Sequence, residues 1–336
     1  MGLGRLEFGG PDLPPRRLRD LLQAQVDAAP PGSRIDWATY YFRDRALAEA
    51  LIRASDRGVR VRLAIEPDPR RKGANDAVIA MLRNHGLNSG LRLFRAAILD
   101  RGHLHAKIYA FSDPDIAWVG SFNPSGDEPE DPQVIAEIGD QDRGHNLLLG
   151  IQQPKLTAAL RRQVASLGWW TPLSLKGRLR FNLSVEDAGT RLYFYPRLRP
   201  LIVEQTIGRL TAGDRFRGAI SHLKKGEFTR QLQLAVERGA SVDLLVHDTE
   251  RRVPSELVEE LSGAGVGIVR VADPNDLPMH AKFLLIDHAG ERSAWLGSHN
   301  FNKKSLKKNA ELLLRTTDAE VVAALDARFD QIAAMA

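Results

Sequence analysis

Hydrophobic and polar positions follow the same order in the two halves of the chain. Residues 46–67 read ALAEALIRASDRGVRVRLAIEP, and residues 227–248 read EFTRQLQLAVERGASVDLLVHD. In both segments, apolar residues at three- and four-residue steps predict a helix, a glycine (Gly58 or Gly239) ends it, and alternating apolar residues predict a strand. The pattern therefore indicates an internal duplication.

The same order continues beyond these segments. Each half continues with a second helix, a short strand, a strand that carries His-Ala-Lys and a strand that ends in Gly-Ser; a terminal helix is expected over residues 319–334, with a counterpart from residue 154. Strands that alternate with helices of this length predict an α/β fold. We expect two similar α/β/α domains, residues 1–175 and 176–336, each with a mixed β-sheet flanked by helices, joined between residues 168 and 190.

Composition excludes several kinds of site and favours one kind of partner. The chain has 336 residues, no cysteine, and 47 Lys and Arg against 42 Asp and Glu, which gives a net charge of +5. The lack of cysteine excludes disulfides, Cys-ligated zinc, iron–sulfur clusters and thiol nucleophiles. The basic balance weakly favours an anionic partner. No stretch approaches the roughly 20 apolar residues of a membrane span, so we expect a cytoplasmic protein or a mature secreted form, with peripheral membrane contact at most.

One set of polar residues occurs twice, at matching places in the predicted order. The first copy has His105 and Lys107, followed by Ser121 and Asn123 in a Gly-Ser-x-Asn segment; the second has His280, Lys282 and Asp287, then Ser298 and Asn300, and later Glu311. On a strand, His at position i and Lys at i+2 point to the same face. Two imidazoles and two ammonium groups around one pocket suit a phosphoryl centre whose oxygens gather negative charge. Because a protonated lysine is not a metal ligand, we expect neither metal nor cofactor.

This doubled arrangement resembles the phospholipase D superfamily, whose motif HxKxxxxD followed by GSxN is usually present twice. The resemblance covers most of the chain and implies one active site at the interface of the two domains. It also implies that His105 attacks phosphorus to form a phosphohistidine while His280 acts as the general acid, and that the motif aspartates serve structure more than chemistry. Because one chain carries both motifs, a monomer suffices.

The two copies are not equal. The position that corresponds to Asp287 is Ser112 in the first half, and the acid, Asp113, comes one residue later. Either a β-bulge returns Asp113 to the register or Ser112 occupies the place, because a one-residue shift turns a side chain to the other face. Alignment of the two halves also places Asn146 opposite Glu311. These two residues are expected to tune the imidazoles differently.

Further residues lie close enough to the motifs to contact substrate. His103 lies two residues before His105, His299 occupies the variable position of the second Gly-Ser-x-Asn, and a lysine cluster that includes Lys303 and Lys304 follows directly. Each of these residues also has a structural explanation: a histidine that caps a strand or is satisfied within the fold, and a solvated lysine face.

The resemblance leaves the substrate open among three hypotheses. The first is hydrolysis or transfer of a phosphatidyl group on a phospholipid. The second is a metal-independent nuclease, favoured by the basic balance, which should lose affinity as salt rises. The third is a catalytically weakened binder of phosphorylated ligands, because the first motif is altered.

Overall fold

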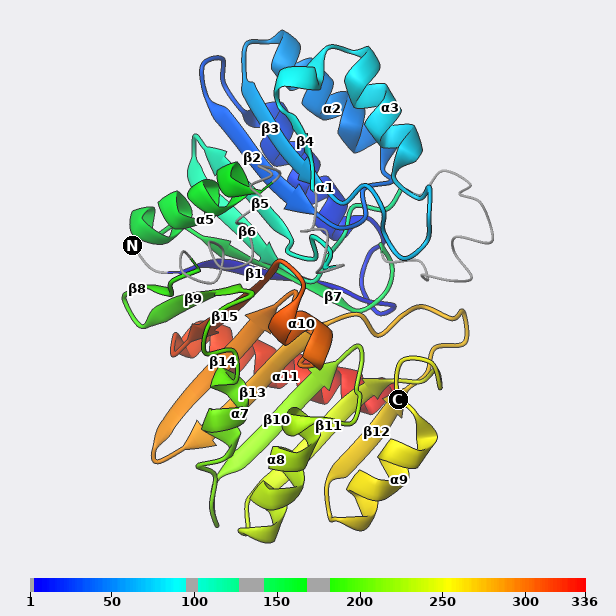
Figure 1. Ribbon diagram of the computed structural model, residues 1–336, viewed down its shortest axis with the longest axis vertical. Coiled ribbons are helices and arrows are strands. Elements are labelled where there is room, and N and C mark those ends of the chain that lie inside the picture. The colour runs from blue at the N-terminus through cyan, green and yellow to red at the C-terminus, as the bar shows by residue number, and fades with distance from the viewer. Residues whose placement is uncertain (1–2, 95–101, 127–141, 168–181) are drawn as a thin grey trace. The chain divides into compact units, whose positions relative to one another are not determined.

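The computed structural model describes residues 3–94, 102–126, 142–167 and 182–336, which form two compact units over residues 1–177 and 178–336 (Figure 1). Each unit is described by itself. The domain boundary expected at residues 175 and 176 lies outside the described residues. In the described parts of the chain, no helix has both the length and the apolar character needed to cross a membrane.

The N-terminal unit is built on a seven-stranded mixed sheet in the order β1-β7-β6-β5-β2-β3-β4. Strands β2, β3 and β4 run parallel to one another, and the other pairings are antiparallel. The strand bounds are β1 Leu3–Gly9, β2 Arg34–Thr39, β3 Arg60–Ile65, β4 Leu91–Leu93, β5 Ile108–Ser112, β6 Asp115–Gly120 and β7 Asn146–Ile151.

Helices cover this sheet and close its core. They are α1 Arg17–Ala28, α2 Arg45–Asp56, α3 Asp76–Asn84 and α5 Pro154–Ser166, with a short 3₁₀ helix, η1 Leu87–Ser89. Apolar residues of α1, α2 and α3 pack with Trp37, Tyr109 and Trp118 of the sheet in one buried cluster. Helix α2 begins where the Asp44 side chain accepts a hydrogen bond from the Leu47 amide, which satisfies one of the unpaired donors of the first turn.

The C-terminal unit repeats this plan on an eight-stranded sheet in the order β12-β11-β10-β13-β14-β15-β9-β8. Its strands are β8 Val185–Asp187, β9 Thr190–Tyr195, β10 Arg215–Ile220, β11 Ser241–His247, β12 Gly267–Val271, β13 Lys282–His288, β14 Glu291–Gly297 and β15 Glu311–Thr316. Its helices are α7 Ile202–Ile207, α8 Glu227–Glu237, α9 Ser255–Gly263, α10 Lys303–Lys307 and α11 Ala319–Met335. In Figure 1, α11 passes behind the sheet while α8 and α9 lie in front of it.

Strand order confirms the duplication. Strands β4-β3-β2-β5-β6-β7-β1 of the first unit match β12-β11-β10-β13-β14-β15-β9 of the second, and β8 is the additional edge strand. The two parallel pairs at the centre, β2 with β3 and β10 with β11, also begin in the same register. Arg34 pairs with Arg60 in the first unit, and Arg215 pairs with Ser241 at the same place in the second. The expected α/β class, with two similar units of mixed sheet flanked by helices, is confirmed.

Candidate active site

Lys107 and Lys282 are the two lysines of the repeated motif, and both are completely buried. Each ammonium group donates a hydrogen bond to the backbone oxygen of the histidine two residues earlier, at 2.7 Å for Lys107 and His105 and at short range for Lys282 and His280. A buried ammonium group is costly unless it is paired. The fold therefore holds one lysine ammonium group next to each motif histidine.

The motif histidines lie just before the strands rather than within them. Strand β5 begins at Ile108 and β13 begins at Lys282, so His105 and His280 occupy the segments that lead into the sheet. The expectation of a strand through His-Ala-Lys is corrected in this respect. His280 is 5% exposed, whereas His105 is partly exposed.

The Gly-Ser turns bring the backbone of neighbouring strands close together. A Cβ atom on Gly120 would lie 2.1 Å from the Leu147 carbonyl oxygen, and one on Gly297 would lie 2.3 Å from the Leu312 oxygen. Such separations are far below a van der Waals contact, so only glycine fits both positions. The close approach places Ser121 and Ser298 against the next strand.

In the C-terminal unit, this serine belongs to a buried network around a carboxylate. The Ser298 hydroxyl donates to Glu311 Oε2 at 2.6 Å, and the other carboxylate oxygen accepts from the Ser305 hydroxyl at 2.7 Å and from the Asn309 amide at 3.2 Å. Glu311 is 1% exposed. Three neighbouring side chains thus hold both oxygens of this carboxyl group by hydrogen bonds.

The N-terminal unit has a neutral version of the same arrangement. The Ser121 hydroxyl donates to Asn146 Oδ1 at 2.9 Å and accepts from the Leu147 amide at 3.1 Å. Asn123 Oδ1 accepts from the Tyr41 amide at 3.3 Å. The alignment of Asn146 with Glu311 thus corresponds to a shared position at the start of β7 and β15.

Tyr40 lies beside His105 and Glu66 lies beside His103, and the sequence predicted a role for neither. The Tyr40 ring centroid lies 5.0 Å from the His105 ring and 5.5 Å from the Lys107 ammonium nitrogen. Glu66 is 3% exposed, accepts from the Leu104 amide at 2.7 Å and lies 3.7 Å from His103 Nδ1. Their positions could have predicted a role in the site. Tyr40 and Glu66 directly follow the ends of β2 and β3, where α/β sheets place ligand-binding residues.

The corresponding positions of the second unit carry different residues. Matched registers place Ser221 after β10 and His247 at the end of β11, where the first unit has Tyr40 and Glu66. Burial, with smaller effects from Arg252 and Lys282, lowers the pKa of His247 to about 3. The carboxyl group of Glu66 in one unit therefore corresponds to a neutral imidazole in the other.

The motif acids lie far from the histidines. Asp287 is five residues along β13 from Lys282, about 17 Å at roughly 3.3 Å per residue, and accepts a hydrogen bond from Arg292 Nε at 2.9 Å. The pairing of β5 with β2 and β6 is continuous, without a bulge, as far as Ser112. Ser112, whose hydroxyl accepts from the Arg34 amide at 2.8 Å, takes the position of Asp287, and Asp113 lies exposed in the following turn.

The remaining sequence candidates divide into buried and exposed residues. His299 is 1% exposed, accepts from the Phe301 amide at 2.9 Å and packs 4.7 Å from the Tyr195 ring, so its place is in the core. Lys303 and Lys304 are exposed on α10. The ranges that the structure describes contain no group of three or more His, Cys, Asp or Glu side chains that could hold a metal ion.

Comparison with known families agrees with this geometry. A family profile described as "Cardiolipin synthase, PLD-like domain" matches residues 22–128 and 208–333, which include both histidine motifs. The chain belongs to this PLD-like domain family and thereby to the phospholipase D superfamily of phosphodiesterases. No curated protein sequence matches the chain.

Solved structures with the same fold extend over nearly the whole chain. A phosphatidylserine synthase from Haemophilus influenzae Rd KW20 aligns with 97% of this chain and 86% of its own, at a TM-score of 0.67 and 12% identity. A polyphosphate kinase from Porphyromonas gingivalis aligns with 98% of this chain at a TM-score of 0.64 and 14% identity. The chain spans half the length of that kinase. At these identities the two likenesses establish the fold.

Proposed function

We propose that this protein is a metal-independent phosphodiesterase of the phospholipase D type that hydrolyses or transfers the phosphatidyl group of a phospholipid. The observation that carries the proposal is the doubled set of a histidine, a buried lysine bonded to it, and a glycine-serine turn anchored on the next strand. In the proposed reaction both sets act on one phosphorus atom.

The reaction proceeds in two displacements on phosphorus. An imidazole nitrogen of His105 attacks phosphorus, the bond to the leaving alkoxide breaks, and the imidazolium of His280 gives its proton to that oxygen. A water or an alcohol then gives its proton to the neutral His280 as its oxygen attacks phosphorus, and the bond to His105 breaks. Lys107 and Lys282 stabilise the charge that develops on the non-bridging oxygens.

The two histidines take different roles in this proposal. The resemblance to the superfamily implies that the histidine of the first half attacks phosphorus, so we assign His105 the role of the nucleophile and His280 that of the general acid. The two units also differ near these motifs, because the C-terminal unit has Glu311 at the position where the N-terminal unit has Asn146.

A phospholipid is the favoured substrate for two reasons. The family profile describes a cardiolipin synthase domain, and the phosphatidylserine synthase shares the fold over nearly the whole chain. In addition, the second unit contains an apolar pocket beside its Gly-Ser-x-Asn turn, rimmed by lysines. Apolar surface next to cationic groups suits an amphiphile better than a uniformly polar substrate.

The test is turnover in the presence of EDTA. Phosphatidylcholine and phosphatidylglycerol, with and without an added primary alcohol, are compared with single-stranded DNA and RNA. We expect release of the headgroup, or formation of the phosphatidyl alcohol, without added metal. Cleavage of nucleic acid but of no lipid would show that the protein is a nuclease. Phosphate binding without turnover of any diester would show that it is a binder of phosphorylated ligands. Loss of activity with EDTA and its recovery with a divalent ion would overturn the two-histidine chemistry.

The phosphoenzyme tests the roles of the two histidines. A substrate labelled at phosphorus is mixed with each variant, quenched in alkali and examined for protein-bound label. We expect an adduct in wild type and in His280→Asn but none in His105→Asn, because only the nucleophile bonds to phosphorus. The opposite pattern would exchange the two roles.

A further inference from the structure

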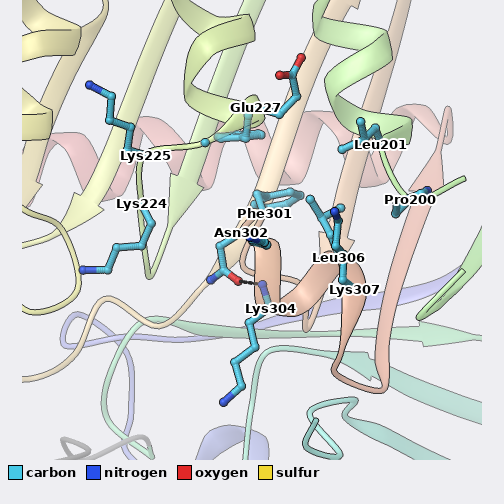
Figure 2. Close-up of a pocket in the computed structure, with 13 residues that line it drawn as sticks. Pro200, Leu201, Lys224, Lys225, Glu227, Phe301, Asn302, Lys304, Leu306 and Lys307 are labelled. Carbon is cyan, nitrogen blue, oxygen red and sulfur yellow. Dashed lines mark hydrogen bonds between the residues drawn. The ribbon is translucent and has the colours of Figure 1, made fainter. Parts of the chain in front are cut away.

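A pocket of about 680 Å³ lies in the C-terminal unit between the segment that precedes α7, the beginning of α8 with the loop before it, and α10 (Figure 2). Its floor is apolar: Phe228, Phe301, Leu201 and Leu306 line it. Phe228 and Phe301 are 2% and 4% exposed and stack at 5.1 Å between ring centroids. The volume falls within the roughly 300–1,000 Å³ of small-molecule sites, and the apolar lining is typical of them.

The rim of this pocket is cationic. Five lysines line it: Lys224, Lys225, Lys303, Lys304 and Lys307. Figure 2 shows Lys224 and Lys225 on the loop to one side of Phe301 and Lys304 extending from α10 on another. The one acidic side chain of the lining, Glu227, is bonded to Arg230 and Gln231, which lowers its pKa, with the bond to Arg230 the larger cause.

Two of these lysines are available to a ligand. Lys225 is engaged by Glu260 at 2.7 Å, and Lys224 donates to the Arg251 backbone oxygen at 2.7 Å. Lys303 and Lys307 are exposed and have no ion-pair partner among the described residues. An apolar floor beneath unpaired ammonium groups complements a molecule with a hydrocarbon chain and an anionic head.

We propose that this pocket binds an anionic phospholipid through one acyl chain, which lies on the apolar floor while the phosphate contacts the lysines of α10. A nucleic acid fits less well, because base stacking needs exposed aromatic faces, and both rings here are buried against each other. The ligand is therefore a phosphate ester of a glycerol that carries an acyl chain.

The pocket is connected to the motif residues by short links. Phe301 follows Asn300 of the Gly-Ser-x-Asn turn, and Asn302 Oδ1 caps α10 by accepting from the amides of Lys304 and Ser305 at 3.0 Å each. Ser305 in turn donates to Glu311. A bound lipid therefore stabilises the helix that holds the Ser298–Glu311 network. The inference goes beyond the proposed reaction, since binding requires no turnover.

Calorimetric titration of the full chain with monomeric lysophosphatidic acid tests the proposal, because this phosphomonoester is no substrate for a phosphodiesterase. We expect one molecule bound per chain, and glycerol 3-phosphate, which has the head without the chain, to bind at least about 100-fold more weakly. Monoacylglycerol, which has the chain without the charge, should bind about tenfold more weakly.

Matched variants locate the site. Lys307→Glu should weaken binding about tenfold, whereas Lys308→Glu, the same charge change at the exposed neighbouring residue outside the pocket lining, should weaken it by less than about twofold. Leu201→Gln should weaken binding about tenfold, and Met335→Gln, at a 40% exposed position in α11, should not. Thermal unfolding of each variant checks that the fold is intact.

Three results would overturn the proposal. They are no binding of lysophosphatidic acid, equal effects of Lys307→Glu and Lys308→Glu, and binding of single-stranded DNA with the Lys307 dependence in place of the lipid. Headgroup release in EDTA without lysophosphatidic acid binding would refute this inference and leave the proposed function standing. Binding of lysophosphatidic acid without turnover of any diester would refute the proposed function and leave this inference standing.

Discussion

The Ser298 hydroxyl donates to the Glu311 carboxylate at 2.6 Å, and both groups are almost completely buried. In the other unit the same turn bonds Ser121 to the neutral Asn146 at 2.9 Å. A duplicated fold therefore supports its two Gly-Ser turns with different electrostatics. The two units can therefore be compared directly: the same serine hydrogen bond is made to a carboxyl group in one unit and to an amide in the other.

Replacing Ser298 and Ser121 by alanine should lower the free energy of unfolding by different amounts. A hydrogen bond to a charged acceptor contributes about 1.5–3 kcal/mol to stability, against about 0.5–1.5 kcal/mol for a neutral one. We expect Ser298→Ala to lower the free energy of unfolding by about 1–2 kcal/mol more than Ser121→Ala, measured by urea denaturation. Equal losses would mean that the Glu311 carboxylate is protonated or hydrated.

The two motif aspartates should contribute little to catalysis. Asp287 lies about 17 Å along its strand from Lys282, and Asp113 lies exposed in a turn after Ser112. We expect Asp113→Asn and Asp287→Asn to retain turnover within about twofold. Asp287→Asn loses a partly exposed ion pair with Arg292 and should cost less than about 1 kcal/mol of stability. A large loss of turnover in Asp113→Asn would show that the turn reaches the substrate.

The Tyr40 ring should matter more than its hydroxyl. The ring contacts the His105 imidazole and lies 5.5 Å from the Lys107 ammonium nitrogen, a cation–π geometry that contributes about 0.5–2 kcal/mol. Burial raises the pKa of Tyr40, so the phenol stays neutral. We expect Tyr40→Leu to lower kcat by about tenfold and Tyr40→Phe by less than about threefold. A larger effect of Tyr40→Phe would instead assign a role to the hydroxyl, which accepts from the Arg70 amide.

Much of the fold was predictable because the repeat supplied two independent copies of each signal. The helix over residues 46–57 and its strand are observed as α2 and β3. The repeat did not predict strands β1 and β2, because both precede the matching segment that begins at residue 46. The strand through His-Ala-Lys was placed too early, because hydrophobic alternation does not reveal where ladder pairing begins.

The candidate site was predictable only where a motif repeats. His105, Lys107 and the Gly-Ser turns are found at matching places in the two units, and their roles remain proposals. Tyr40 and Glu66 have no counterpart of the same type in the second half, so comparison of the halves could not find them. His299 shows the converse, since a residue inside a motif packs into the core next to Tyr195. Side-chain direction at such positions depends on packing that the linear pattern does not contain.

Glu204 on α7 should make stability depend on pH. It is 2% exposed, neither carboxylate oxygen has a hydrogen-bond partner in another described residue, and burial raises its pKa to about 7, with a smaller effect from Glu227. Because the unfolded value is 4.5, the folded protein binds more protons between these values. The free energy of unfolding therefore decreases as pH rises through this window, by about 3 kcal/mol.

Replacement of this carboxyl by an amide tests the dependence. The difference in unfolding free energy between Glu204→Gln and wild type should shift by about 3 kcal/mol in favour of the variant as pH rises from about 4.5 to about 7. His247, whose pKa is lowered to about 3, contributes the opposite slope below pH 6.5, but it is present in both proteins and cancels in the difference. Glu237→Gln, an exposed carboxylate on α8, is the matched control. A pH-independent difference would show that Glu204 is already ionised and solvated in the folded protein.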